Sequence, residues 1–235
     1  MAEELAEKEL IDRLNSIRER IEAASEKAGR STDDISLIAV SKNQPLSKID
    51  FFQKNGLEVF AESRVQELTE KYEEKSNLNW HFIGHLQRNK VKYLLRMDNC
   101  KLIHSLDSWR LAGEINKRAK KNNRVMPVLL EINVAGEENK YGITPEQVED
   151  FLKDSVRLEN IEIKGLMTIA PYVDDPEEVR PIFKSLAMIK QEMQNKGFEN
   201  IEELSMGMSN DFEIAIEEGS TMLRIGSALF GKRGG

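Results

Sequence analysis

The sequence predicts an α/β protein that folds as a single-domain (β/α)8 TIM-type barrel with an extra helix at its N-terminus. Three observations carry this prediction. Short apolar runs alternate with amphipathic segments along the whole chain. The number of these runs is that of a closed barrel, and roughly 200 residues are enough to build one. Finally, no Pro-, Gly- or Ser-rich linker divides residues 1–235, so we expect one domain.

The first element, residues 3–28, has the pattern of a long amphipathic helix. Apolar residues such as Leu10, Leu14, Ile17 and Ile21 recur at helical spacing among Glu, Lys and Arg. Gly29 follows as a natural C-cap. Because this helix precedes the first strand, we expect it to flank or plug the barrel rather than to connect two strands.

The strand-like runs are apolar on both faces, as is typical of parallel strands covered by helices. They lie at residues 35–40, 57–61, 80–83, 101–106, 126–134, 161–169, 202–206 and 222–226. Helical segments lie between them, at residues 47–55, 62–75, 87–97, 107–121, 145–155, 176–196 and 211–218. Alternating strands and helices imply parallel crossovers. The count favours a closed barrel, and a doubly wound open sheet is the alternative.

Helix-start signals support several of these segments. Asp107 precedes one helix, and Thr144-Pro145 and Asp175-Pro176 each place a capping residue before a first-turn proline. Ser209-Asn210-Asp211 also reads as an N-cap, with the serine hydroxyl free. A short helix is expected at residues 227–230.

Composition excludes several functional classes. The net charge of −7 argues against a nucleic-acid groove or an anionic membrane as partner. No apolar run is long enough to span a membrane, and the N-terminus is acidic. Cys100 is the single cysteine, which favours a reducing, cytoplasmic location and an inert buried thiol. We expect no metal site, since His81 and His85 lie in a strand and in a turn rather than on one helix face.

Polar residues follow most of the predicted strands, where parallel barrels place their active sites. Lys42 follows the first strand directly. A lysine at the rim of an apolar barrel loses its proton more readily than one in water, and its free amine can attack a carbonyl. The alternative for Lys42 alone is a solvated residue that starts a loop.

The ends of the last two predicted strands have the features of an anion site. Ser209 offers a hydroxyl, and Gly226 and Ser227 let the backbone approach a ligand closely before a helix N-terminus. Arg224 lies inside an apolar strand, where an unpaired charge is costly. It therefore needs a partner, either Glu131 on the fifth strand or a bound ligand.

A nucleophilic amine beside an anion site suggests one ligand, an aldehyde that carries a phosphate. Pyridoxal 5′-phosphate (PLP) fits both requirements. The first and last strands of a closed barrel are neighbours, so the two sites are adjacent.

Six short motifs in order strengthen this reading. They are Leu37-Ile38-Ala39-Val40-Ser41-Lys42, Val65-Gln66-Glu67, His81-Phe82-Ile83-Gly84 with Leu86-Gln87, Gly165-Leu166-Met167, Ser205-Met206-Gly207-Met208-Ser209, and Arg224-Ile225-Gly226. Together they resemble the pyridoxal phosphate homeostasis proteins, over nearly the whole chain from about residue 10. The resemblance implies a single alanine racemase N-terminal-like barrel domain that binds PLP.

The resemblance also implies roles for individual residues. Lys42 would match the family lysine that holds PLP as a Schiff base. Ser209, Gly226 and Ser227 would match the phosphate contacts.

Two further residues would face the cofactor ring. Arg224 would match the arginine beside the pyridine nitrogen, where it keeps that nitrogen unprotonated and weakens the ring as an electron sink. Met167, at the end of a strand, is expected to form a soft apolar wall. One departure is visible, because Ala61-Glu62-Ser63 stands where the family usually has Gly-Glu-Asn. Any contact that the asparagine makes with the cofactor is therefore in question here.

We expect a PLP carrier rather than an enzyme. Racemases of this barrel type take a second base, a tyrosine, from a C-terminal domain, whereas this chain ends at Gly235, and none of its tyrosines is expected to face the ring. The expectation is a monomer that buffers PLP or delivers it to PLP-accepting apo-enzymes, in support of vitamin B6 homeostasis. The alternatives are a small PLP-dependent amino-acid racemase or lyase, and a Schiff-base aldolase that uses Lys42 without a cofactor.

Overall fold

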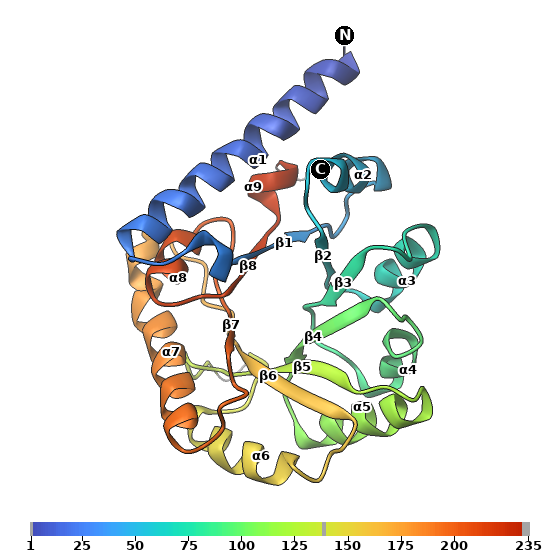
Figure 1. The fold of residues 1–235 in the computed structure, drawn as a ribbon, viewed down its shortest axis with the longest axis vertical. Coiled ribbons are helices and arrows are strands. Elements are labelled where there is room, and N and C mark those ends of the chain that lie inside the picture. Colours follow the sequence, from blue (N-terminus) through green and yellow to red (C-terminus); the bar gives the residue numbers. More distant parts are fainter. Residues whose placement is uncertain (1, 138–139, 232–235) are drawn as a thin grey trace.

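A computed structural model describes residues 2–137 and 140–231. Its strands hydrogen-bond in chain order into a closed parallel barrel, in which the last strand pairs with the first. The strands are β1 (Ser36–Val40), β2 (Val59–Glu62), β3 (Asn79–Phe82), β4 (Cys100–Leu106), β5 (Met126–Glu131), β6 (Ile161–Met167), β7 (Glu203–Ser205) and β8 (Met222–Ile225). Figure 1 shows them as a ring with the helices outside. The predicted (β/α)8 barrel is confirmed, and the open sheet is wrong.

The connecting helices lie close to their predicted positions. They are α2 (Leu46–Lys54), α3 (Val65–Glu74), α4 (Val91–Leu94), α5 (Trp109–Lys121), α6 (Val148–Ser155), α7 (Arg180–Asn195), α8 (Phe212–Glu217) and α9 (Ser227–Phe230). Short 3-10 turns at 88–90, 145–147 and 176–179 precede α4, α6 and α7. In the last two, the turn begins at a proline, whose missing N–H is tolerated at a helix start.

The caps predicted at Thr144 and Asp175 are confirmed, and the one at Asp107 is wrong. Thr144 forms a capping box with Gln147, and the Asp175 side chain accepts a hydrogen bond from the Glu177 N–H. Asp107 does not cap α5. Ser108 caps it instead, by accepting from the Leu111 N–H.

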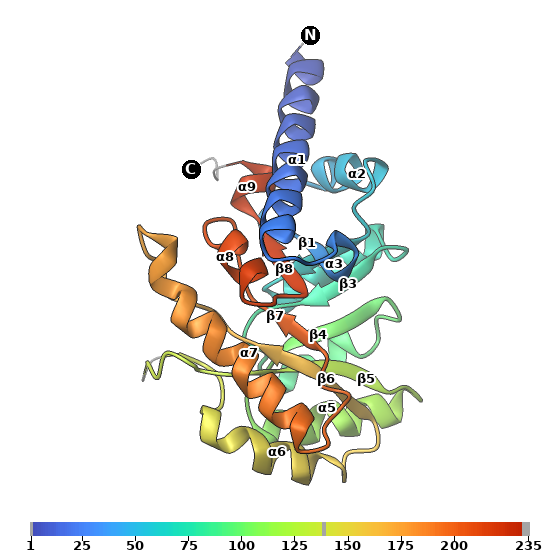
Figure 2. The same cartoon turned by 60° about the vertical axis from the view of Figure 1, so that its left-hand side comes forward.

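The long N-terminal helix α1 (Ala2–Lys27) flanks the barrel. It packs on α8 and α9, with Leu14, Ile17 and Ile21 buried. Its N-terminal half projects away from the barrel, as both views show (Figure 1 and Figure 2). Arg20 fixes it to α8, because its guanidinium stacks 4.4 Å from the centre of the Phe212 ring.

Apolar side chains fill two layers. The larger layer lies between strands and helices and contains Phe52, Phe60 and Trp80. The smaller one fills the barrel itself with two clusters, Ile38-Val40-Ala61 and Leu102-Leu129-Met167. Successive residues of a strand point to opposite faces, so every second residue belongs to the interior.

Several composition-based expectations can be compared with the described residues. Cys100 is fully buried, and burial raises the pKa of its thiol to about 12, which makes it unreactive as expected. Over residues 2–137 and 140–231, no helix has the length and apolarity needed to cross a bilayer. The end of the chain at Gly235, on which the expected absence of a second domain rested, lies outside the described residues.

Candidate functional site

The interior positions of the strands continue into one cavity at the C-terminal rim of the barrel. Along β1, Ile38 and Val40 face the interior, and Lys42 follows at the next position of the same parity. The same step of two leads from Ala61 in β2 to Ser63. The cavity encloses about 490 Å³, and its lining includes Lys42, Ser63, His85, Glu131, Tyr141, Ile169, Tyr172, Ser209, Arg224, Gly226 and Ser227.

The cavity brings together all the predicted site residues except Met167. Lys42 comes from the end of β1, and Arg224, Gly226 and Ser227 come from β8 and the start of α9. These strands are hydrogen-bonded neighbours, with Ile38 paired to Arg224 in the register. The predicted adjacency of the amine and the loop after β8 is therefore present.

Met167 lies one layer too deep to line the cavity. It is fully buried inside the barrel and packs in the cluster with Leu102 and Leu129. Ile169, two residues after Met167, points to the same side of the chain and lines the cavity. Since both have the same inward orientation, the apolar wall expected of Met167 is supplied by Ile169.

Arg224 is buried and bound by neutral partners. Its guanidinium donates to Ser205 Oγ at 2.6 Å and to the Thr168 carbonyl at 2.9 Å. Glu131, the expected carboxylate partner, makes no direct hydrogen bond with it among the described residues. Burial lowers the pKa of Arg224 to about 10, and the charges of Asp211 and Glu131 oppose that shift. The guanidinium therefore stays charged at neutral pH.

Two buried histidines, His81 and His104, are linked to Arg224 through Ser205 and were not predicted as part of the site. His104 Nδ1 lies 2.8 Å from Ser205 Oγ, and His104 Nε2 lies 3.0 Å from His81 Nδ1. Burial lowers the pKa of His81 to about 3, and it lowers the pKa of His104 well below its ordinary value. Both imidazoles are thus neutral at physiological pH, and they connect Arg224 to the barrel interior by hydrogen bonds.

The anion site expected around α9 has an internal acceptor. Ser209 Oγ accepts hydrogen bonds from the N–H groups of Gly226 at 3.3 Å and Ala228 at 3.1 Å. Its oxygen therefore already accepts two hydrogen bonds, which was not expected, while neither bond uses its O–H as a donor; the N-cap of α8 is Asp211. The backbone N–H groups at the start of α9 thus point toward Ser209 and already bind an oxygen atom there, that of the serine.

Glu131 is the acidic group of the cavity. It ends β5, is only 6% exposed and lines the cavity with Arg224. Burial and, to a lesser extent, the charge of Asp107 raise the pKa of its carboxyl to about 7, against the opposing charge of Arg224. The cavity therefore contains a carboxyl that changes its charge near neutrality.

Replacing Glu131 by glutamine will flatten the pH dependence of the free energy of unfolding between pH 4.5 and about 7. In this window the folded protein keeps the proton on the carboxyl, whereas the unfolded chain releases it. The contribution of Glu131 to stability is complete below pH 4.5 and is lost as the pH rises through about 7. The difference in slope is at most about 1.4 kcal/mol per pH unit.

Urea unfolding of both proteins across this window measures the effect. Glu62 also has a raised pKa, but it is common to both proteins and cancels in the difference between the two curves. Parallel curves would mean that Glu131 is already ionised in the folded protein.

Two tyrosines lie at the cavity, although none was expected there. Tyr141 stacks on His85, with the ring centres 3.7 Å apart and the planes within 10°. His85 Nδ1 lies 3.0 Å from Asp107 Oδ2, which fixes the imidazole. Tyr172 lines the same cavity and is 84% exposed. Both tyrosines belong to loops, whose paths cannot be inferred from apolar periodicity.

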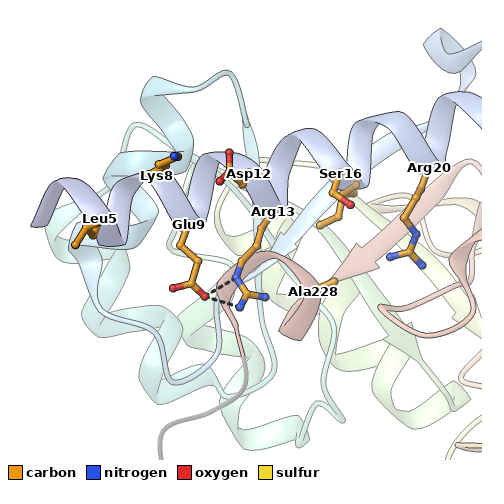
Figure 3. A pocket seen from close by; sticks show the side chains of 9 residues that line it. Leu5, Lys8, Glu9, Asp12, Arg13, Ser16, Arg20 and Ala228 are labelled. Atoms are coloured by element: carbon orange, nitrogen blue, oxygen red, sulfur yellow. Dashed lines mark hydrogen bonds and ion pairs between the residues drawn. The ribbon is translucent and has the colours of Figure 1, made fainter. Parts of the chain in front are cut away.

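A second hollow of about 560 Å³ runs along α1 (Figure 3). Its lining is mostly charged, and Glu9 pairs there with Arg13 at 2.6 Å on the same helix. Its lining comes from α1 and from Ala228 of α9, and it includes no side chain from a barrel strand of the described structure. Among the described residues no group of three or more His, Cys, Asp or Glu side chains is arranged to hold a metal ion. The rim cavity is therefore the candidate site.

Comparison with known proteins agrees with this geometry. The family described as alanine racemase, N-terminal domain, matches residues 13–234. The pyridoxal phosphate homeostasis protein of Aquifex aeolicus is 50% identical over 224 residues, which cover 94% of this chain and 97% of that protein. Its counterpart in Vibrio cholerae is 36% identical over 226 residues, covering 94% of each chain.

A solved structure is similar over the same extent. PipY of Synechococcus elongatus, with PLP bound, superposes with a TM-score of 0.81 at 32% identity, and the match covers 94% of this chain and all of that chain, 100%. The predicted resemblance is confirmed. The chain belongs to the alanine racemase N-terminal domain family and, within it, to the pyridoxal phosphate homeostasis proteins.

Proposed function

We propose that this protein binds PLP in the rim cavity and takes part in the homeostasis of PLP and vitamin B6. The observation that carries the proposal is the meeting of Lys42, Arg224 and the Gly226-Ser227 backbone around one cavity. The PLP-bound relative and the name shared by the curated relatives support it. When bound, PLP supplies an aldehyde that a lysine amine can hold as a Schiff base and a phosphate that backbone N–H groups can bind.

The residues present fit this cofactor. A volume of about 490 Å³ is within the range of small-molecule sites. Lys42 provides the amine, and Ser209, whose oxygen accepts from the Gly226 and Ala228 N–H groups, provides an O–H donor for the phosphate beside the start of α9. A guanidinium can only donate hydrogen bonds, so Arg224 suits a pyridine nitrogen that carries no proton. Such a ring is a weak electron sink, and this favours retention of the cofactor over catalysis.

A carrier is therefore the first candidate, and a PLP-dependent amino-acid racemase or lyase is the second. The tyrosines at the cavity favour the second, because Tyr141 and Tyr172 could supply an acid–base group that the carrier does not need. The two candidates differ in one measurement. Turnover of an amino acid above that of free PLP, abolished by Lys42→Ala, would establish an enzyme; its absence supports the carrier.

The proposal is tested by adding PLP to the purified protein, reducing with borohydride and mapping the labelled peptide. We expect the label on Lys42. A protein that binds no PLP, or that carries the label elsewhere, would refute the proposed site. In the same experiment, saturable binding of PLP at Lys42 would refute the alternative of a Schiff-base aldolase that works without a cofactor.

Arg224→Ala will weaken PLP binding by about 1.5–3 kcal/mol, the usual range for a hydrogen bond to a charged group. Equilibrium titration of absorbance measures the affinity. Arg124→Ala is the control, because the Arg124 guanidinium likewise donates two hydrogen bonds to neutral acceptors, the carbonyl groups of Met97 and Cys100, but does not line the cavity. If both variants bind PLP as the parent does, Arg224 is not part of the site.

The remaining partners follow from the same proposal. We propose a cytoplasmic monomer that transfers PLP to PLP-accepting apo-enzymes. The compartment is inferred from cysteine usage, because Cys100 is the single cysteine of the sequence and has no partner for an internal disulfide. Light scattering of the purified protein tests the monomer, and transfer of PLP to an apo-enzyme tests delivery.

A further inference from the structure

A buried ionic cluster lies on the outer side of the barrel wall, next to the candidate site but outside its cavity. Glu62 ends β2 and has the opposite parity to Ser63, so its side chain points toward α3. It is fully buried there, and Lys71 of α3 reaches it at 2.7 Å. Glu67, one turn earlier on α3, lies 2.8 Å from the same ammonium group. The proposed function assigns no role to these three residues.

The cluster binds the backbone on both sides of Lys42. The Lys71 ammonium donates to the Ser41 carbonyl at 2.7 Å, directly before Lys42. The Asn43 N–H, directly after Lys42, donates to Glu67 Oε1 at 2.5 Å. The Ser41 hydroxyl adds a third link, since it donates to Glu62 Oε1 at 2.6 Å.

The bound segment ends in a left-handed turn. Asn43 has φ of 59°, in a region that asparagine adopts more readily than other residues apart from glycine. Conformations of this kind persist where the surroundings fix them. The chain turns sharply at this point, immediately after Lys42 has left β1.

Stability alone does not explain the arrangement. Burying charges is expensive, and apolar residues of similar volume commonly do as well or better in a protein core. Here one carboxyl oxygen, Glu62 Oε2, is buried without a hydrogen-bond partner among the described residues. What the charges achieve and apolar side chains could not is the binding of the two peptide groups that flank Lys42.

We propose that Lys71, together with Glu62 and Glu67, is a positioning group for Lys42. It holds the Ser41 carbonyl and the Asn43 N–H in place, and this fixes how far the Lys42 side chain extends into the cavity. The inference rests on the proposed function, in which the Lys42 nitrogen forms a C=N bond with the aldehyde carbon of PLP. The aldehyde oxygen leaves as water, with two protons from the amine.

The test compares two ligands that differ at one group. PLP carries the aldehyde, whereas pyridoxine 5′-phosphate carries an alcohol there and forms no bond with an amine. Lys71→Met will lower the affinity for PLP by about tenfold or more, because bringing the amine to the aldehyde then requires the backbone of residues 41–43 to be ordered or strained without the support of Lys71. The affinity for the alcohol will stay unchanged, because the cavity itself is intact. Lys75→Met is the matched control, as Lys75 ends the same helix and pairs with Asp50 at the surface.

A second variant covers failure of Lys71→Met to fold. Glu67 is only partly buried, and Glu67→Ala removes the acceptor of the Asn43 N–H and one of the two carboxylates that pair with Lys71, while Glu62 stays in place. It will reduce the preference for the aldehyde in the same direction. If the ratio of the two affinities stays at the parent value in the variant that folds, the positioning role is refuted, whether both affinities fall together or neither moves.

The parent protein separates this result from failure of the proposed function. A parent that prefers PLP to the alcohol and is labelled at Lys42 supports the proposed function, whatever the variants do. A parent without that preference refutes the Schiff base itself, and the positioning role with it.

Discussion

Lys42→Ala will abolish borohydride-stable labelling of the protein by PLP and leave its thermal unfolding nearly unchanged. Lys42 is only half-buried, and its side chain lines a cavity rather than filling the core. Its removal therefore opens no void in the core and costs much less than the several kcal/mol of a core truncation. The covalent link, by contrast, requires this amine. Mass spectrometry after reduction measures the label, and calorimetry measures the unfolding temperature.

Lys48→Ala is the control for this experiment. Lys48 is also half-buried and close in sequence, but it donates to the carbonyl of Phe230 and does not line the cavity. We expect labelling of this variant at the parent level. Labelling that survives in Lys42→Ala and maps to one other lysine would move the site to that lysine.

Gly165→Ala will destabilise the fold by at least about 3 kcal/mol, at the upper end of what overpacking causes. A Cβ at this position in β6 would lie 2.0 Å from the backbone oxygen of Glu203 in β7. Neither strand can move away alone, since each is hydrogen-bonded on its other edge within the closed ring. Denaturant unfolding measures the loss.

Gly113→Ala is the matched substitution. Gly113 lies in α5, is exposed, and a Cβ there would meet nothing within 4 Å. Alanine is the better helix former, so this variant will be more stable by roughly 0.5–1 kcal/mol. If the free energy of unfolding falls in Gly165→Ala and rises in Gly113→Ala, the loss at Gly165 is due to the close approach of β6 and β7. A neutral Gly165→Ala would mean that β6 and β7 can separate locally.

The barrel was predictable because its strands are covered on both faces. Each strand is then a short apolar run that is visible without any knowledge of its neighbours, as in Ser36–Val40. Boundaries were less accurate. The fifth strand was expected to reach residue 134 but ends at Glu131, and only a single bridge between Ile132 and Ile143 continues it. Apolar character persists there after strand pairing stops.

Strand ends and strand parity give different information about the cavity. Lys42 was selected because it follows a strand end, and Arg224 because a charge inside an apolar strand needs a partner. Parity distinguishes inside from outside. It does not give depth, and so Met167 was placed against the cofactor although Ile169, of the same parity, lines the cavity. The partners of Arg224 depend on which strands lie opposite in the closed ring. Sequence alone could not select Ser205 over Glu131.

Residues that reach the site from loops and helices were missed for a different reason. Tyr141 lies in the long connection after β5, and nothing in its composition indicates that it stacks on His85. Lys71 did leave a signal, since it falls three residues after the buried Leu68 on the inner stripe of α3. A lysine among the buried positions of a helix predicts a carboxylate partner on the adjacent strand, which here is Glu62.

The strands β1 and β8 are far apart in the sequence but are hydrogen-bonded neighbours in the barrel. Lys42 follows the first of them, Arg224 lies in the second, and both line the cavity. A nascent chain on the ribosome therefore cannot assemble the cavity before β8 has been synthesised. A small molecule that binds there favours the closed ring over any form in which β1 and β8 are unpaired.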